Sequence, residues 1–318
     1  MNVPLQTVHF DSPLPGPHLL ITGGVHGDEF EGPAAIDRLR IQFESARFPL
    51  KRGRLTLVPI VNQPAFLRGE RTAEDGLDLA RVCPGNPEGS ITERIACELS
   101  QLIRSADRYI DLHSGGRLFS ILPMSGYVLH PDETVLNEQR SMAMSFNLPL
   151  IWGTSPHLNG RSLSVARDAD IPAIYAEHSG AGQCNPQGVE DYIYGCLNVM
   201  ASLGMIDFVN RDSLVELTIE DDRPESGHMQ LCYPSPLMGL FEPAVQLGDH
   251  IKQEASLGRV FDPVTHRTET IHARQSGILF VARSFTRVKA GESVGVILET
   301  DRTSEFRVGG GSDETIPG

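Results

Sequence analysis

The 318-residue sequence is poor in cysteine and in positive charge, and both shortages exclude classes of protein. Its cysteines are odd in number and form no C-x-x-C pair: Cys83, Cys97, Cys184, Cys196 and Cys232. A disulfide framework or a cysteine zinc site is therefore a poor interpretation, and reduced thiols in a cytoplasm are expected.

Basic residues number 27 against 41 acidic ones, and the formal net charge is −14. Nucleic acids and anionic membrane surfaces attract clustered Lys and Arg, so neither is expected as a partner. No apolar run approaches the roughly 20 residues that cross a bilayer. The first residues also lack the basic and apolar regions of a signal peptide, and we expect none.

Residues 18–205 alternate short apolar runs with helical patterns, which predicts an α/β fold. The predicted strands are 18–24, 54–62, 107–113, 126–130, 149–153 and 171–178. The predicted helices are 33–45, 91–105, 134–146, 162–169 and 187–203, the second with a capping box of Ser90 and Glu93. Strands interleaved with helices predict a mixed, mainly parallel sheet with helices on both faces.

Helical periodicity stops near residue 210, and the chain continues as β-type sequence. Residues 239–260 and 277–297 look related, which predicts a small all-β domain with a pseudo-repeat similar to the hammerhead of biotinyl and lipoyl carriers. A carrier presents its modified lysine commonly beside methionine, and no Met-Lys pair occurs here. The domain is expected to serve packing or oligomerisation, which makes a homo-oligomer the expected assembly. The predicted domains are 1–209 and 210–305, followed by a disordered tail at 306–318.

One histidine and three acids gather in "GGVHGDEFEG" (23–32), directly after the first predicted strand. The stretch has no lysine and matches neither GxxxxGK[ST] nor GxGxxG, and its carboxylates would repel a phosphate. A cation fits better, because His26 and Glu29 offer the nitrogen and oxygen ligands that zinc accepts. The H-x-x-E spacing alone is a weak signal, since it occurs by chance in many chains.

Further functional side chains follow the other predicted strands. Ligands of open α/β sheets bind outside the carboxyl ends of the strands. The second strand ends at Asn62, the third at Asp111-x-His113 and the last at Glu177-His178. The polar segment after the second strand carries Arg68, Arg71 and Arg81. This convergence of histidines, carboxylates and arginines predicts one site at that edge of the sheet.

The predicted site has the composition of a catalytic zinc centre. His26, Glu29 and His113 form a His₂Glu set, which leaves one position open for water, with one zinc expected per chain. Asp111 shares a strand face with His113 and is expected to brace it. Zinc would lower the pKa of the water to about 7, and Glu177 would take the proton as the hydroxide attacks a carbonyl. Amide hydrolysis follows as the reaction class, with arginines available to stabilise the oxyanion.

The sequence resembles the succinylglutamate desuccinylase/aspartoacylase family, a branch of the zinc-carboxypeptidase-like fold. The resemblance spans most of the chain and rests on "GGVHGDEFEG", "VPIVNQPAF", "RTAEDGLDLARVCPGNPEGSITERIA", "DLHSGG", "IPAIYAEHSGAG" and "SGILF". These motifs are more similar to those of the bacterial deacylases, including the N-acetyl-diaminobutyrate deacetylase-like branch, than to those of the animal aspartoacylases. The resemblance implies a catalytic domain over 1–209 and the zinc ligands named above. It also implies that Glu177 acts as general base and acid.

The resemblance further implies that Arg71 polarises the scissile carbonyl and that Arg81 binds a substrate carboxylate. Asn62 and His178 are also assigned to substrate binding. Two positions depart from the family pattern. Ala80 stands where the family usually has Asn ("DLNR"), and His178 follows the general base where a small or apolar residue is usual. Strand alternation favours a His178 side chain that faces away from the site.

The predicted function is a zinc-dependent amidohydrolase that deacylates a small N-acyl amino acid or related carboxylate. Two alternatives stay open. One is a metallocarboxypeptidase acting on small peptides. The other is a non-catalytic metal-containing binding protein, in which the missing Asn has cost turnover.

Overall fold

The computed structural model describes residues 5–208, 212–224, 226, 227, 229 and 232–300. The chain divides into two compact units, Met1–Gly227 and His228–Gly318. The domain boundary predicted at 209 and 210 and the tail predicted at 306–318 lie outside the described residues. Each unit has its own sheet structure and is described by itself below.

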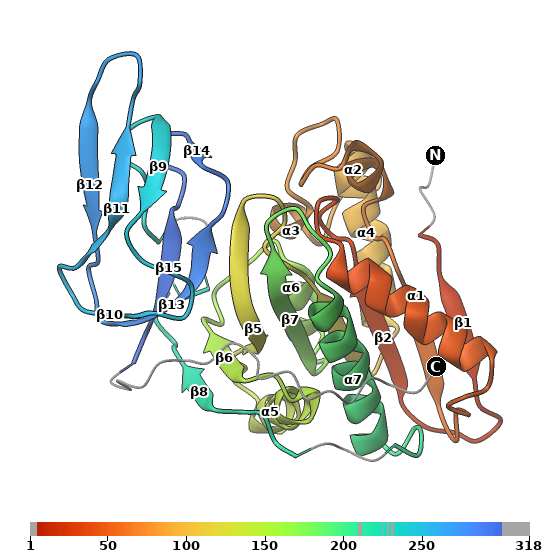
Figure 1. Cartoon of the computed structure of the whole chain (residues 1–318). Coiled ribbons are helices and arrows are strands. Elements are labelled where there is room, and N and C mark those ends of the chain that lie inside the picture. Colours follow the sequence, from red (N-terminus) through yellow and green to blue (C-terminus); the bar gives the residue numbers. More distant parts are fainter. Residues whose placement is uncertain (1–4, 209–211, 225, 228, 230–231, 301–318) are drawn as a thin grey trace. The chain divides into compact units, whose positions relative to one another are not determined.

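The N-terminal unit is built on one mixed sheet (Figure 1). Its strands are, in spatial order, β1 (Val8–Asp11), β3 (Arg54–Val58), β2 (His18–Gly23), β4 (Arg108–Leu112), β7 (Ala173–Gly180), β5 (Phe119–Val128), β6 (Leu150–Thr154) and β8 (Leu217–Glu220). Strands β3, β2, β4 and β7 run parallel, and β1 and β5 pair antiparallel at the two sides of this group. Strands β6 and β8 continue parallel to β5. The carboxyl ends of β2, β4 and β7 therefore meet at one edge.

Helices cover both faces of this sheet (Figure 1). They are α1 (Glu31–Glu44), α2 (Gln63–Arg68), α3 (Leu79–Val82), α4 (Ile91–Arg104), α5 (Glu133–Phe146), α6 (Ser162–Arg167) and α7 (Pro186–Ser202). Helix α7 packs between α1 and α5, while α4 packs against α6. Buried Leu20, Tyr109 and Ala173 from the central strands join Leu99 of α4 in one apolar core. The predicted α/β class is confirmed.

Local sequence signals explain where several helices begin. Ser90 and Glu93 cap α4 reciprocally, with the Ser90 amide donating to Glu93 Oε2 at 2.8 Å, so the predicted capping box is confirmed. Helices α2 and α3 were not predicted, because they have only six and four residues and show no apolar periodicity. Asn62 and Asp78 cap them with their side chains. Asn62 is the last residue of the second predicted strand, and Asp78 lies in the polar segment that follows it.

The C-terminal unit is all-β over its described residues. Its strands are β9 (Gly239–Pro243), β10 (His250–Ile251), β11 (Ser256–Phe261), β12 (Thr268–His272), β13 (Gly277–Arg283), β14 (Arg287–Val288) and β15 (Gly295–Glu299). In each half of the predicted pseudo-repeat the first strand pairs antiparallel with the last, β9 with β11 and β13 with β15. Phe241, Val260, Leu279 and Ile297 share one buried core, so both halves stabilise the same unit.

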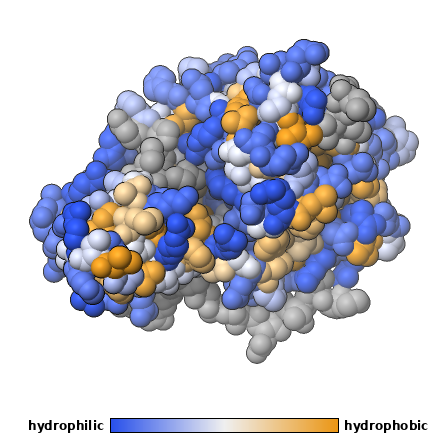
Figure 2. Space-filling model, turned by 90° about the horizontal axis from the view of Figure 1, so that it is seen from above, coloured by the Kyte–Doolittle hydropathy of each residue, from blue (hydrophilic) through white to orange (hydrophobic). Residues whose placement is uncertain are grey.

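Most of the molecular face in Figure 2 is hydrophilic, with separate hydrophobic patches. This surface agrees with a formal net charge of −14. Within the described parts of the chain, every helix is too short or too polar to cross a membrane.

Candidate metal centre and active site

The turn after β2 brings His26 and Glu29 to the carboxyl edge of the sheet. Gly27 lies so close to the α2 backbone that a Cβ there would be 2.0 Å from the carbonyl carbon of Ala65. Only glycine fits this approach, which explains part of the glycine content of the motif. His113 follows β4, the parallel neighbour of β2, and Glu177 lies near the end of β7, the neighbour of β4.

His26, Glu29 and His113 converge closely enough to hold one ion. Each offers a ligand atom, and these atoms all lie within 4.8 Å of one another. Glu29 lies between the two rings: its Oε1 is 2.7 Å from His26 Nδ1 and its Oε2 is 3.0 Å from His113 Nδ1. Burial alone would raise the pKa of Glu29, but the two imidazoles outweigh it and hold that pKa well below its usual value.

Both histidines turn their other nitrogen toward an aspartate. His26 Nε2 is 3.1 Å from Asp78 Oδ1, and His113 Nε2 is 3.1 Å from Asp111 Oδ2. A carboxylate facing Nε2 favours a proton there, which leaves Nδ1 as the ligating nitrogen in both rings. The two Nδ1 atoms are also the ones that face Glu29.

Asp111 is fully buried and is held by Thr22 and Ser162 as well as by His113. Thr22 Oγ1 donates to its Oδ1 at 2.7 Å, and Ser162 Oγ donates to its Oδ2 at 2.5 Å. Burial would lower the pKa of His113, but Asp111 and Glu29 raise it well above its usual value. The Asp111 carboxylate therefore orients the His113 ring, the role expected from their shared strand face.

Asp78 is a residue that the sequence analysis missed. Besides facing His26, it caps α3 by accepting from Ala80 N at 2.9 Å. Its Oδ2 accepts from Arg71 Nη2 at 3.0 Å and from Arg71 Nε at 3.2 Å. One carboxylate thus joins a candidate ligand to a candidate catalytic arginine. Burial would raise the pKa of Asp78, but His26 and Arg71 keep it far below its usual value.

Glu177 is buried, with 6% of its surface exposed, and its Oε2 has no hydrogen-bond partner among the described residues. Burial raises its pKa well above the usual value, and the charges of Glu29 and Asp111 add to that effect. His113 and Arg71 act in the opposite direction. Glu177 therefore lies in the electrostatic field of the histidine cluster, with a free acceptor atom.

Three arginines adjoin the cluster. Arg71 Nη1 lies 3.6 Å from Glu29 Oε1, and Arg81 Nη1 donates to the Ala80 carbonyl at 2.6 Å. Arg161, which the sequence analysis missed, precedes α6, and its Nη2 donates to the Gly227 carbonyl at 3.2 Å. Burial and the charge of Arg81 lower the pKa of Arg161 to about 10. Guanidinium groups that disfavour one another in this way are suited to binding an anion.

Asn62 and His178, assigned to substrate binding from sequence, both make contacts within the protein, and Asn62 Nδ2 is buried without a partner among the described residues. Asn62 is fully buried, and its Oδ1 accepts from Ala65 N at 3.3 Å at the start of α2. His178 is 4% exposed and faces α7, where its Nε2 lies 3.1 Å from Asp191 Oδ2. Both ring nitrogens of His178 are bonded within the protein. These contacts hold the ring against Ser179 and α7, and the assignment of His178 to substrate binding stays a prediction.

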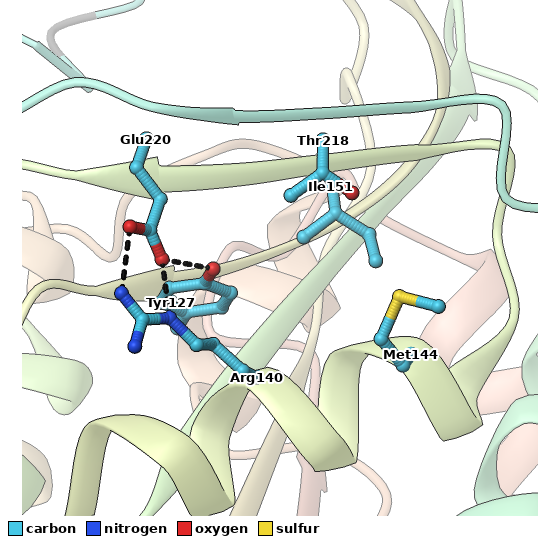
Figure 3. A pocket seen from close by; sticks show the side chains of 6 residues that line it. All are labelled: Tyr127, Arg140, Met144, Ile151, Thr218 and Glu220. Carbon is cyan, nitrogen blue, oxygen red and sulfur yellow. Dashed lines mark hydrogen bonds and ion pairs between the residues drawn. The ribbon is translucent and has the colours of Figure 1, made fainter. Parts of the chain in front are cut away.

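A second polar region of the N-terminal unit is a surface pocket of about 450 Å³ (Figure 3). It is lined by Tyr127, Arg140, Met144, Ile151, Thr218 and Glu220. Arg140 donates to both oxygens of Glu220, at 2.7 and 2.8 Å, and Tyr127 donates to Oε1 at 2.7 Å. The charges of this pocket thus neutralise one another, and the contacts join α5 to β8.

The family model of the succinylglutamate desuccinylase/aspartoacylase catalytic domain matches residues 15–203 of this sequence. The chain belongs to this family, as its resemblance indicated. One relative, the N-alpha-acetyl-L-2,4-diaminobutyric acid deacetylase of Halomonas elongata, is 32% identical over 305 residues, which are 89% of this chain and 82% of that protein.

Solved structures of similar proteins share the fold. The product-bound ectoine utilization protein EutE (DoeB) from Ruegeria pomeroyi has a TM-score of 0.82 at 27% identity, covering 92% of this chain and 88% of that one. A succinylglutamate desuccinylase/aspartoacylase from Rhodobacter sphaeroides has a TM-score of 0.80 at 26% identity, covering 93% and 89%.

Proposed function

We propose that this chain is a zinc-dependent deacylase that hydrolyses the amide bond of a small N-acyl amino acid. The observation that carries the proposal is the cluster of His26, Glu29 and His113 beside a buried Glu177 carboxyl with an unpartnered oxygen. Family membership and the deacetylase relative support the reaction class.

The residues of the cluster suit one zinc ion per chain. Two imidazole nitrogens and one carboxylate are a common catalytic donor set, and the aspartates behind both rings suit neutral imidazole ligands. When bound, zinc supplies Lewis acidity, which makes water a competent nucleophile near neutral pH and polarises a carbonyl.

Glu177 would move the proton during hydrolysis. Its unpartnered Oε2 accepts the proton that water loses as the new C–O bond forms. The same carboxyl then gives this proton to the nitrogen as the C–N bond breaks, so the products are a carboxylic acid and a free amine. A raised pKa suits a group that must hold a proton between these two steps.

The arginines suit a substrate that carries a carboxylate. Arg71, already oriented by Asp78, is the candidate for stabilising the developing oxyanion. Arg81 and Arg161 add two further cationic donors. With Ala80 in place of an amide side chain, carboxylate recognition falls to these guanidinium groups.

The test combines metal analysis with a substrate panel. Purified protein should contain one zinc per chain and should deacylate N-acyl amino acids faster than it cleaves dipeptides or C-terminally amidated analogues. Glu177→Gln should keep the zinc and lose about 10²- to 10⁴-fold in kcat. Faster turnover of dipeptides would favour a carboxypeptidase, and unchanged kcat in Glu177→Gln would remove it as the base.

We also propose a cytoplasmic homo-oligomer. The five cysteines are all free thiols, which suits a reducing compartment. Exposed apolar side chains such as Met238 (59%) and Val264 (83%) in the C-terminal unit are candidates for a subunit contact. Light scattering coupled to gel filtration would give the subunit number, and a monomer at micromolar concentration would contradict the assembly.

A further inference from the structure

The strand that carries Glu177 ends in an unusual backbone conformation. Ser179 has φ 54°, Gly180 has φ 119° and Ala181 has φ 55°. A left-handed backbone is readily adopted by glycine but disfavoured for residues with a Cβ, so Ser179 and Ala181 must be held there by their surroundings.

The pairing of β7 with β5 is irregular beside this segment. Met124 is opposite Glu177 and Ile121 is opposite Ser179, so β5 bulges by one residue across from His178. The bulge contains Pro123, which has no amide hydrogen to donate. The regular strand pairing is therefore interrupted at His178 and resumes at Ser179.

Backbone hydrogen bonds hold part of this segment, since Ser179 O accepts from Gly115 N at 3.2 Å and Ala181 N donates to Phe119 O at 2.8 Å. Side chains add further hydrogen bonds to these. His178 Nε2 donates to Asp191 Oδ2 across 3.1 Å, which leaves Nδ1 as an acceptor. Ser179 Oγ donates to His178 Nδ1 across 2.7 Å and accepts from Asn185 Nδ2 at 2.9 Å. Each donor in this chain of hydrogen bonds therefore faces an acceptor.

The chain of hydrogen bonds is anchored in α7. Asn185 also caps that helix, with its Oδ1 accepting from Gln187 N at 2.9 Å. A Cβ on Gly188 would lie 2.8 Å from His178 Nδ1, so the ring packs directly on the helix backbone. The histidine that departs from the family pattern thus ties the end of β7 to α7.

We propose that His178, Ser179 and Asn185 form a clamp that positions Glu177 by fixing the left-handed end of its strand. The inference rests on the proposed role of Glu177 as general base. Ser179, His178 and Asp191 are also the residue types of a nucleophilic triad. If these residues formed a nucleophilic triad, the serine hydroxyl itself would be essential. A clamp needs only the backbone conformation that the hydroxyl enforces.

Substitutions at Ser179 separate the clamp from the triad. Ser179→Ala keeps the Cβ and loses both hydrogen bonds, and kcat should fall about 10- to 100-fold, since a small misplacement of a catalytic group has that effect. Ser179→Gly should recover kcat to within about threefold of wild type, because glycine adopts φ 54° unaided. Equal inactivity of the two variants would overturn the clamp.

Substitution of His178 tests the clamp independently. His178→Ala should lower kcat about 10-fold, with KM and the zinc content per chain held near wild type. In the His178→Ala/Ser179→Gly double variant most of that loss should vanish, because the two changes act on one conformation.

The matched control is His130→Ala. His130 is also a buried histidine, 7% exposed, with its Nδ1 accepting from Asp132 N at 3.0 Å. This variant should lose thermal stability without any change in kcat per folded, zinc-loaded chain.

Glu177→Gln separates failure of the clamp from failure of the proposed function. If Glu177→Gln is inactive while Ser179→Ala and His178→Ala keep kcat within twofold of wild type, the clamp is wrong and the proposed base stands. If Glu177→Gln retains kcat, the base is wrong and the clamp has nothing to position.

Discussion

Two polar regions of the N-terminal unit differ in how their buried atoms are paired. In the pocket of Figure 3, Arg140, Glu220 and Tyr127 satisfy one another. At the carboxyl ends of β2, β4 and β7, Glu177 Oε2 and Asp28 Oδ1 are buried without a partner among the described residues. Such atoms destabilise a fold unless something binds them. The strand-end region thus keeps buried acceptor atoms unpaired, whereas the charged groups of the pocket pair with one another.

The pKa shifts also differ in direction between the pocket and the strand ends. In the pocket, the hydrogen bonds with Glu220 raise the pKa of Arg140, and Arg140 in turn lowers the pKa of Glu220. Each charge is stabilised by the other, as in an ordinary ion pair. At the strand ends, burial raises the pKa of Glu177, so its carboxylate is held in a less favourable state than in water. A carboxylate in that state is suited to take a proton.

The largest expected effect is loss of the metal on removing His113. In His113→Ala, Glu29 and His26 would remain as two ligands, and the zinc content should fall far below one per chain. Turnover should fall at least about 10³-fold, because the Lewis acid is lost with the ion. Metal analysis after dialysis and kcat on the preferred N-acyl amino acid would measure both.

His130→Ala serves as the matched control for this variant. It removes a buried histidine that bonds the Arg167 carbonyl at 3.2 Å, outside the cluster, and should keep full zinc content. One zinc per chain retained in His113→Ala would exclude that histidine from the ligand set.

The meeting of strand ends could be predicted from sequence because it depends on regular elements. Apolar runs indicate the strands, and parallel neighbours place their following residues at the same edge. His26, Glu29, His113 and Glu177 all come directly from such ends, and the structure brings the first three within ligand distance.

Asp78 and Arg161 could not be predicted this way, because each lies in irregular chain. Asp78 precedes a four-residue helix, and its contacts with His26 and Arg71 depend on how the whole polar segment packs. Its one local signal is the position of an Asp before "LARV", which is typical of a helix cap. Arg161 reaches the Gly227 carbonyl, 66 positions away, and no local pattern encodes that contact.

A smaller effect is expected from Asp78→Asn, which keeps the shape of the side chain and removes its charge. His26 would lose the carboxylate behind Nε2, so zinc affinity should fall about 10- to 100-fold. Arg71 would lose its ion pair, so kcat of the zinc-saturated variant should also fall. Titration against a competing chelator measures the affinity separately from turnover.

Asp75→Asn is the matched control in the same segment. Asp75 accepts from Thr92 N at 3.0 Å and from Thr92 Oγ1 at 2.8 Å, and it contacts neither histidine. This variant should lose some stability and keep its zinc affinity. An equal loss of affinity in both variants would mean that Asp78 acts through the fold of the segment and not through His26.

The smallest effect is expected in the pocket of Figure 3, where the charged groups are paired with one another. Tyr127→Phe removes the hydroxyl that donates to Glu220, while both contacts between Arg140 and Glu220 remain. The free energy of unfolding should fall by about 1 kcal/mol, the usual net value of one hydrogen bond. Because every charge stays paired, kcat and zinc content should match wild type. Urea unfolding and steady-state kinetics on the same sample make the comparison. A loss of kcat at full zinc content would show that this pocket is coupled to the strand-end site, and the contrast between paired and unpaired regions would no longer separate structure from function.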